Sequence, residues 1–312
     1  MIRLSIAALL FSATAAAAFP VTVQSCDREV TFDAPPERAI SNDVNLTEMM
    51  LVLGLRDRMV GYTGISGWKT LDAEMREGIA ELLELSEKYP SKEVLVGAEP
   101  DFFFAGWNYG MKVGGEVTPD TIAPFGIAVY ELTESCTHIM SMPEASMDTM
   151  YQDILNLGTI FGVSDRAEAL VEGYRARLAE VTSAVDLADP MRVFVYDSGE
   201  DAPFTAGRYA MPTALIEAAG GVNIMGDLEK SWAVVGWEAV VERNPEVVVI
   251  VNYGDVTAEQ KIAFMRENAA FAEIDAVRNN RFVVLEYVEA TPGPRNIAAV
   301  ETLVAGFARA GE

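Results

Sequence analysis

One stretch of this sequence occurs twice, and the repeat constrains the fold more than any other feature. Residues 93–110 read EVLVGAEPDFFFAGWNYG, and residues 238–254 read EAVVERNPEVVVIVNYG. Each copy predicts a helix that ends at Pro100 or Pro245, because proline cannot continue it, followed by a buried strand and Asn-Tyr-Gly. Chance recurrence of a helix, a proline and a strand is the alternative, and the length of the match disfavours it.

The rest of the chain alternates short apolar segments with amphipathic ones, which indicates a mostly parallel sheet in each half. The expected strands are 38–41, 59–62, 101–105, 127–130, 193–196, 247–251 and 282–285. The expected helices are 46–53, 120–124, 212–219, 237–243, 258–266 and 296–308. Residues 21–23 and 29–32 alternate apolar with polar side chains and predict a small hairpin.

The length favours two lobes, since domains usually hold ~100–200 residues. We expect a first lobe at 19–149, one long connecting helix at 150–189 and a second lobe at 190–312. A break near 162–165, with Ser164 capping a second helical segment, is the alternative. A helical connector is stiffer than a Gly/Ser linker, so we expect only small changes in the angle between the lobes.

Ligands of open α/β sheets bind beyond the carboxyl ends of the strands, so the two repeats predict one cleft that is lined from both lobes. Aromatic side chains recur where strands or helices should end, and such walls are typical of small-molecule sites. The candidates are Tyr62, Trp68, Tyr89, Trp107, Tyr109, Phe204, Trp232, Tyr253 and Tyr287. Arg208, Arg295 and Lys112 are candidate cations for an anionic ligand. Residues 197–208 are rich in turn formers and predict a binding loop.

The first eighteen residues predict an export signal, with Arg3, an apolar stretch at 4–11 and a small-residue cleavage site at 16–18. The mature chain would begin at Phe19 in the periplasm. Cys26 lacks the apolar lead-in of a lipoprotein cysteine, which favours a free periplasmic protein over a lipid-anchored one. We expect this protein to be a monomer.

The two cysteines of an exported chain predict one disulfide, Cys26 to Cys136, with two buried free thiols as the alternative. His138 is the one histidine of the sequence, and a lone histidine is more often an ordinary surface or core residue than a ligand. We therefore expect no protein-bound metal and no cofactor.

The formal charge of −24 argues against a nucleic-acid partner, because phosphate binding needs clustered Lys and Arg. The sequence has no phosphate-binding loop, nucleophile elbow or CxxC pair. We expect a binding protein and not an enzyme. A hydrolase that uses a carboxylate pair in the cleft is the alternative, since 47 acidic residues always offer candidate pairs.

The sequence resembles the vitamin B12, haem and ferric-siderophore class of periplasmic binding proteins of ABC importers. The matching segments follow in order as PERAISNDVNLTEMMLVLGLRDRMVGY (36–62), EVLVGAEPDFFFAG (93–106), PFTAGR (203–208), AAGGVNIMGD (218–227), WAVVGWEAVVERNPEVVVI (232–250) and PGPRNIAAVETL (292–303). The resemblance implies two Rossmann-like lobes, each with a mostly parallel central sheet, joined by a long backbone helix. It implies capture of a metal chelate, with a ferric siderophore first and a corrinoid or haem next.

The resemblance also assigns roles to individual positions. Ligand contacts would fall at Tyr62, Trp107, Phe204, Trp232 and Tyr287, with Arg295 as a further candidate. Glu93 and Glu238 hold the same place in the two repeats and would dock into arginine pockets of the permease dimer. The sequence departs from binders of strongly anionic siderophores, because it lacks several cleft arginines, and it has no cleft histidine beyond His138.

Overall fold

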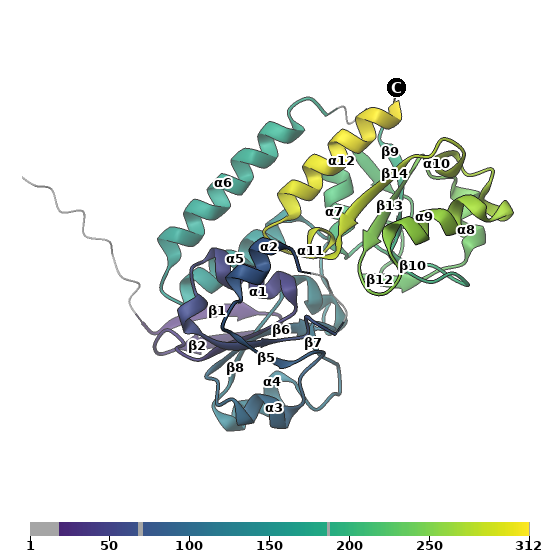
Figure 1. Ribbon diagram of the computed structural model, residues 1–312. Coiled ribbons are helices and arrows are strands. Elements are labelled where there is room, and N and C mark those ends of the chain that lie inside the picture. Colours follow the sequence, from purple (N-terminus) through teal and green to yellow (C-terminus); the bar gives the residue numbers. More distant parts are fainter. Residues whose placement is uncertain (1–18, 68–70, 186–187, 312) are drawn as a thin grey trace, which may run out of the picture.

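A computed structural model describes residues 19–67, 71–185 and 188–311, and it confirms the predicted α/β class with two lobes (Figure 1). The first sheet has the strand order β5-β4-β3-β6-β7, with β8 also paired to β6, and its pairings are parallel. Its strands are β3 (Ala39–Asn42), β4 (Met59–Thr63), β5 (Leu83–Ser86), β6 (Phe102–Trp107), β7 (Gly110–Met111) and β8 (Ala128–Glu131).

Helices cover both faces of this sheet, so its central strand can be apolar throughout. All six residues of β6 are buried. Figure 1 shows α3 and α4 on one side, with α1, α2 and α5 on the other. These helices are α1 (Val44–Val52), α2 (Ala73–Gly78), α3 (Lys92–Gly97), α4 (Pro119–Ile122) and α5 (Met147–Ile160).

The second sheet has the order β11-β9-β13-β14, again with parallel pairings. Its strands are β9 (Met191–Tyr196), β11 (Gly221–Asn223), β13 (Val247–Asn252) and β14 (Phe282–Glu286). Successive side chains of a strand point to opposite faces. Phe194 therefore packs in the core under α8 (Trp237–Arg243), α9 (Ala258–Glu267) and α10 (Asp275–Arg278), whereas Val193 packs in the core of α7 (Met211–Ala218) and α12 (Asn296–Gly311).

Shorter elements complete both lobes. A two-stranded antiparallel sheet, β10 (Phe204–Ala206) with β12 (Trp232–Val234), flanks the second sheet, and α11 (Tyr287–Ala290) follows β14. The 3-10 helices are η1 (Arg56–Arg58), η2 (Ala123–Phe125), η3 (Thr133–His138) and η4 (Ala269–Phe271). The expected strands and helices are confirmed within a few residues, but β5, β7, β10, β11 and β12 were not predicted because each is short or weakly apolar.

The prediction of one long helix over 150–189 is wrong. The chain forms α5, which ends at Ile160, and a separate α6 (Ser164–Thr182). Gly162 has φ +68°, a left-handed conformation that ends α5 and that glycine adopts at little steric cost. Ser164 is the first residue of α6 and does not cap it, because the capping position is Val163 and makes no side-chain bond.

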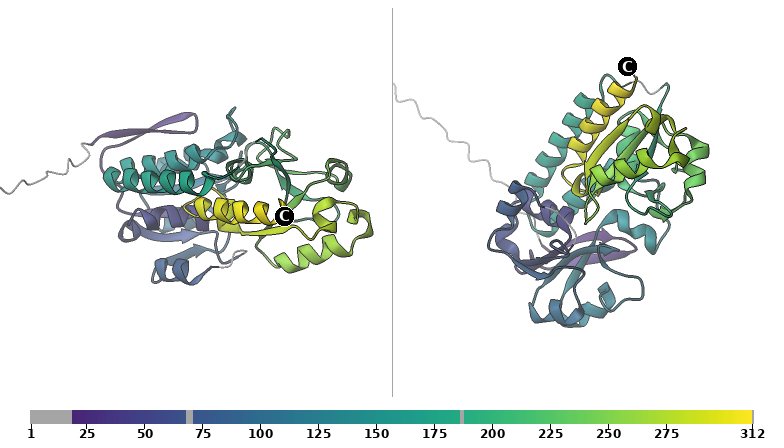
Figure 2. Two further views of the ribbon diagram at one scale, coloured as in Figure 1. Left: turned by 90° about the horizontal axis from the view of Figure 1, so that it is seen from above. Right: turned by 45° about the vertical axis from the view of Figure 1, so that its right-hand side comes forward.

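Helix α6 is the element that runs between the lobes. It lies beside α12 in all views, along the side of the molecule away from α3 and α8 (Figures 1 and 2). Apolar residues on both helices join one core that continues from the first lobe into the second. No helix in the described part of the chain is long and apolar enough to cross a membrane.

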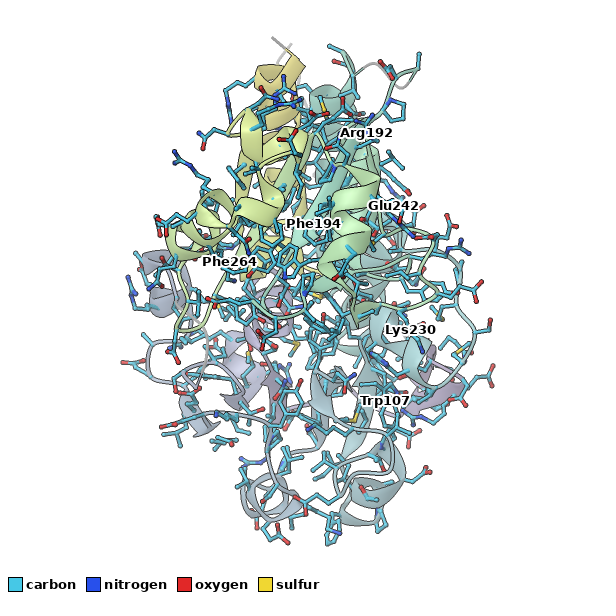
Figure 3. The ribbon with its side chains drawn as sticks, turned by 90° about the vertical axis from the view of Figure 1, so that its right-hand side faces the viewer. Trp107, Arg192, Phe194, Lys230, Glu242 and Phe264 are labelled. Carbon is cyan, nitrogen blue, oxygen red and sulfur yellow. A yellow bond between two sulfur atoms is a disulfide. The ribbon has the colours of Figure 1, made fainter. Side chains whose placement is uncertain are left out.

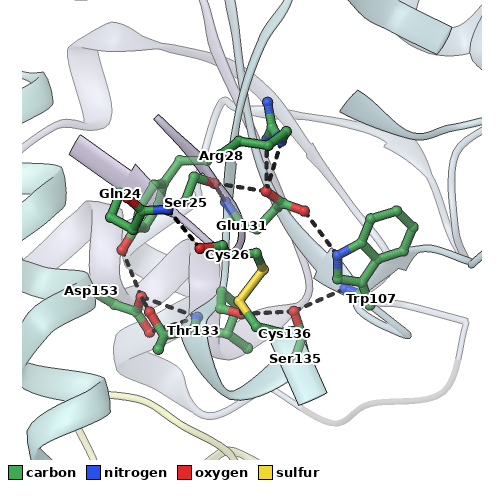
Figure 4. Close-up of a disulfide and its surroundings, with 12 residues drawn as sticks. Gln24, Ser25, Cys26, Arg28, Trp107, Glu131, Thr133, Ser135, Cys136 and Asp153 are labelled. Atoms are coloured by element: carbon green, nitrogen blue, oxygen red, sulfur yellow. Dashed lines mark hydrogen bonds and ion pairs between the residues drawn. A yellow bond between two sulfur atoms is a disulfide. The ribbon is translucent and has the colours of Figure 1, made fainter. Parts of the chain in front are cut away.

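The N-terminal hairpin is confirmed as β1 (Val21–Ser25) and β2 (Arg28–Phe32), which pair antiparallel. Its turn carries Cys26, and the predicted disulfide to Cys136 is present, with the Cα atoms 5.2 Å apart. Figure 4 shows this bond beside Glu131, whose carboxylate accepts hydrogen bonds from Ser25 and Arg28 of the hairpin. The hairpin is thus fixed to the first lobe by a covalent bond and a partly buried ion pair. The export signal predicted at 1–18 lies outside the described residues.

Candidate ligand-binding site

A cavity of about 470 Å³ lies between the lobes and is lined from both of them. It is found where the carboxyl ends of β3, β6, β9 and β13 meet, as expected for open α/β sheets. The lining residues of the first lobe are Asp43, Tyr89, Asn108, Tyr109 and His138. Those that follow residue 190 are Asp197, Phe204, Ser231, Trp232, Val251, Tyr253, Tyr287, Ala290 and Thr291.

The sequence repeat forms equivalent structures in the two lobes. In each copy a short helix, α3 or α8, ends before a proline, and the residue preceding that proline is left-handed, with φ +50° at Glu99 and +41° at Asn244. The proline then leads into the central strand, β6 or β13. The tyrosines of the two Asn-Tyr-Gly segments, Tyr109 and Tyr253, consequently both line the cavity.

Asp43 is held in a strained position at the end of β3. Its backbone has φ 76° and ψ 159°, a region that residues other than glycine rarely occupy and that is found mainly at functional sites. Its carboxylate accepts from the backbone N–H of Val44 at 2.6 Å and from the hydroxyl of Tyr287 at 2.9 Å. Burial, and then the charge of Asp43, raise the pKa of Tyr89 and Tyr287 above the usual range.

Asp197 is the acidic group of the second lobe, directly after β9. Tyr253 and Ser198 donate to its Oδ1 at 2.7 and 2.8 Å. Lys261 lies behind it and donates to the backbone carbonyls of Asp197 and Val251. Burial raises the pKa of Asp197, while the bonds from Tyr253 and Ser198 and the charge of Lys261 oppose that rise.

Aromatic rings form a large part of the wall. Phe204 and Trp232 are stacked, with ring centroids 5.7 Å apart and planes at 24°. The antiparallel pairing of β10 with β12 holds them side by side. Tyr253 and Tyr287 form a second ring pair at 5.3 Å. Such rigid apolar surfaces are suited to a flat or bulky organic ligand.

His138 ends η3 and reaches the cavity from the first lobe. Its Nε2 lies 3.2 Å from Nδ2 of Asn108, a residue that is itself left-handed with φ +65°. If the amide donates, Nε2 accepts, and the imidazole carries its proton on Nδ1. Burial, and then the charge of Lys230, lower the pKa of His138, so the ring is neutral at neutral pH. In the described part of the chain no group of three or more His, Cys, Asp or Glu side chains is arranged to hold a metal ion.

The comparisons with known proteins identify the family. The family model described as periplasmic binding protein matches residues 43–288 of this chain. The chain belongs to the periplasmic binding protein family.

Relatives within this family span nearly the whole chain. A cobalamin-binding protein of Halobacterium salinarum is 27% identical over 304 residues, which cover 94% of this chain and 75% of the relative. A periplasmic binding protein from Veillonella parvula has 29% identity and a TM-score of 0.80, and the match covers 92% of this chain and 96% of that one. An ABC-type Fe3+-hydroxamate transport system structure from Saccharomonospora viridis has 25% identity and a TM-score of 0.79, with 93% and 99% covered.

Six of the predicted ligand-site residues of this periplasmic binding protein line the cavity, namely Tyr89, Tyr109, Phe204, Trp232, Tyr253 and Tyr287, and five are placed elsewhere. Tyr62 is buried in a small cluster with Val44, Ile65 and Met75. Trp107 belongs to the face of β6 that packs with α3 and α4. Its Nε1 donates there to Glu131 at 2.8 Å (Figure 4). Figure 3 shows Trp107 within the first lobe, below Lys230. Trp68 lies outside the described residues.

The candidate cations are also absent from the cavity lining that the structure describes. Arg208 lies 3.4 Å from Glu144 and 3.8 Å from Glu229. Arg295 pairs with Glu48 at 2.6 Å and with Asp72. Lys112 lies over the Tyr89 ring, 5.8 Å from its centroid. The acidic partners of the two arginines are distant in sequence, so residue type alone could not reveal that these charges are already paired.

Sequence reasoning did not single out Asp43, Asn108, His138 or Ser231 as lining residues, and it included Asp197 only as the first residue of the binding loop predicted at 197–208. Three of these residues could have been predicted from their place in the sequence, since Asp43 and Asp197 directly follow strands and Asn108 lies in the repeat. His138 was treated as an ordinary residue because nothing in the sequence places η3 beside the cleft. Glu93 and Glu238 are both exposed, each as the second residue of its helix.

Proposed function

We propose that this chain is the extracytoplasmic solute-binding component of an ABC importer and that its inter-lobe cavity captures a metal chelate. The observation that carries the proposal is the cavity itself, which is built from equivalent strand ends of two lobes and walled by six aromatic side chains. The ligand candidates are a hydroxamate-type ferric siderophore or a corrinoid, with haem next. The names of the Saccharomonospora and Halobacterium relatives support the first two.

Hydrolysis by a carboxylate pair has less support. The two cavity carboxylates, Asp43 and Asp197, each accept a hydrogen bond from a tyrosine, which fixes them as structural acceptors. The relatives reported above are named for binding or transport, which supports a protein that captures and delivers its ligand unchanged.

Delivery needs a permease, and Glu93 and Glu238 are the proposed contacts. They occupy the same position in α3 and α8, the two helices that begin the repeat. Both are exposed and take no part in the cavity lining. A matched pair of carboxylates, one per lobe, could engage a permease dimer at two equivalent points.

The test is to purify the protein after export and identify what it carries by native mass spectrometry. Its thermal unfolding is then followed with ferrichrome, ferrioxamine B, cyanocobalamin and haemin. A ligand at 100 times its dissociation constant stabilises the folded state by about 2.7 kcal/mol. We expect a co-purified chelate or a rise in the unfolding temperature with at least one of the four. An unchanged unfolding temperature with all four, and no bound metal, would overturn the proposal.

A further inference from the structure

The polar groups of the cavity are mostly hydrogen-bond acceptors. The hydroxyls of Tyr253 and Tyr287 donate to Asp197 and Asp43. The hydroxyl of Tyr89 donates to the backbone carbonyl of Asn108, and that of Thr291 donates to the carbonyl of Tyr287 at 3.0 Å. A hydroxyl has one proton, so each of these four oxygens can only accept from a ligand.

The charged side chains of the cavity lining are also hydrogen-bond acceptors. Two carboxylates, Asp43 and Asp197, are part of the lining, and no Lys or Arg is among the described lining residues. Oδ2 of Asp197 receives no hydrogen bond from the described residues, because Tyr253 and Ser198 both donate to Oδ1.

Three lysines lie near the cavity without lining it. Lys261 is buried behind Asp197 and held by two carbonyls, and it offsets part of that carboxylate's charge. Lys112 lies over the Tyr89 ring, and the charge of Lys230 acts on His138. Ser231 also lines the cavity, and its hydroxyl bonds to the Glu134 carboxyl. The side-chain donors that the described lining can turn toward a ligand are few, namely the indole N–H of Trp232, the amide of Asn108 and the N–H of His138.

We propose that this cavity selects its chelate by charge and by hydrogen-bonding pattern. It accepts neutral or cationic chelates whose rim carries donors, such as carboxamide or ammonium groups, and it rejects chelates whose rim carries carboxylates or catecholates. This inference rests on the proposed function, since it names the class of chelate that the same site takes. A carboxylate rim would meet like charges, and it offers no donors to the acceptors of the lining.

The test compares ligands that differ only at the rim. Ferrioxamine B carries an ammonium group, its N-acetyl derivative is neutral and its N-succinyl derivative ends in a carboxylate. Cobinamide and cobyrinic acid form a second pair, with carboxamides in the first and carboxylates in the second on the same corrin. Titration calorimetry on the exported protein should give at least tenfold tighter binding of the amide or ammonium form in whichever series binds, which corresponds to about 1.4 kcal/mol.

Two variants connect this preference to the named residues. Asp43→Asn and Asp197→Asn should each reduce the preference by about tenfold. Asparagine also caps helices and tolerates a positive φ, so Asp43→Asn should fold, and Asp197→Asn provides an independent second site. Asp255→Asn, an exposed change outside the cavity, should leave the preference unchanged.

The outcomes separate the two proposals. Equal binding of the acidic and amide forms, or a preference unchanged in both aspartate variants, would overturn charge selection while leaving chelate capture intact. If no chelate of either series binds, and none of the four ligands described above raises the unfolding temperature, the proposed function is overturned and this inference with it.

Discussion

Trp232 is the residue whose removal should weaken ligand binding most clearly. Its ring is stacked on Phe204, is only partly buried, and lines the cavity. Trp232→Ala should weaken binding at least tenfold, or about 1.4 kcal/mol, by calorimetry, because an aromatic contact surface is lost while the lobe core stays intact. Phe125→Ala, which removes a ring that is 53% exposed elsewhere, is the matched control. An affinity for the Trp232 variant equal to that of the control would exclude this ring from the site.

The disulfide between Cys26 and Cys136 should contribute strongly to stability. It closes a loop across a sequence separation of 110, for which loss of chain entropy in the unfolded state predicts about 4–5 kcal/mol. Replacing both cysteines by alanine should lower the free energy of unfolding in urea by that order. A loss below about 1 kcal/mol would show that this hairpin crosslink constrains the unfolded chain little.

The sequence indicated which types of residue line the cavity better than it indicated which way each side chain points. Tyr109, Tyr253, Phe204 and Trp232 were expected in the cleft because strand ends and turns are visible in the sequence, and all four line the cavity. Trp107 was placed in the cleft, although it belongs to the face of β6 that packs with α3 and α4. One residue of strand register decides which face a side chain occupies, and the register of β6 was not fixed by the sequence.

Among the elements, η3 has the most informative contact between the lobes. Glu134 is buried there, and its carboxyl accepts from the backbone N–H of Met211, at the start of α7, at 2.6 Å. The hydroxyl of Tyr109, which lines the cavity, lies 3.4 Å from the other oxygen. Burial raises the pKa of Glu134 to about 8, and burial raises the pKa of Asp153, on the neighbouring α5, to about 7.

These raised pKa values predict that stability falls as the pH rises. Between the ordinary carboxyl pKa and the folded-state value, the folded protein holds a proton that the unfolded chain has lost. The free energy of unfolding should therefore decrease from about pH 5 to pH 8, by up to about 1.4 kcal/mol per pH unit for each group. Urea unfolding at several pH values measures this slope.

Glu134→Gln supplies the control for that slope, because it keeps the shape of the protonated carboxyl and cannot ionise. We expect a flatter pH dependence up to pH 8, with the remaining slope contributed by Asp153 and by other carboxyls whose pKa burial raises, such as Asp197. A stability that increases over this range in the unchanged protein would contradict the account of buried, protonated carboxyls at the lobe contact.

Helices and strands were predicted well where apolar periodicity was strong. They were predicted poorly where the conformation of one residue sets a boundary. Strands β9 and β13 were predicted closely because they are short apolar runs followed by polar residues. The break between α5 and α6 was given only as an alternative, since apolar residues continue at helical spacing on both sides of Gly162. The left-handed backbone of that glycine, which ends the helix, is not a periodic signal.

At the scale of the whole molecule, the matched helices α3 and α8 give a prediction about the transporter. Changing Glu93 and Glu238 together to Ala should abolish stimulation of ATPase activity in a reconstituted importer and leave ligand affinity unchanged, because both side chains are exposed and neither lines the cavity. The same double change at Glu242 and Glu267 is the control for lost surface charge. Full stimulation by the Glu93 and Glu238 double variant would refute docking at these positions.

The central claim is that the ligand is held between the lobes, and anomalous diffraction from crystals of the complex tests it most directly. A bound chelate contains iron or cobalt, whose anomalous signal locates the metal without reference to the surrounding protein. We predict one strong peak in the cavity bounded by Asp43, Trp232 and Tyr253. A peak instead in the surface pocket beside Trp107 and Arg28, with the inter-lobe cavity empty, would contradict the account.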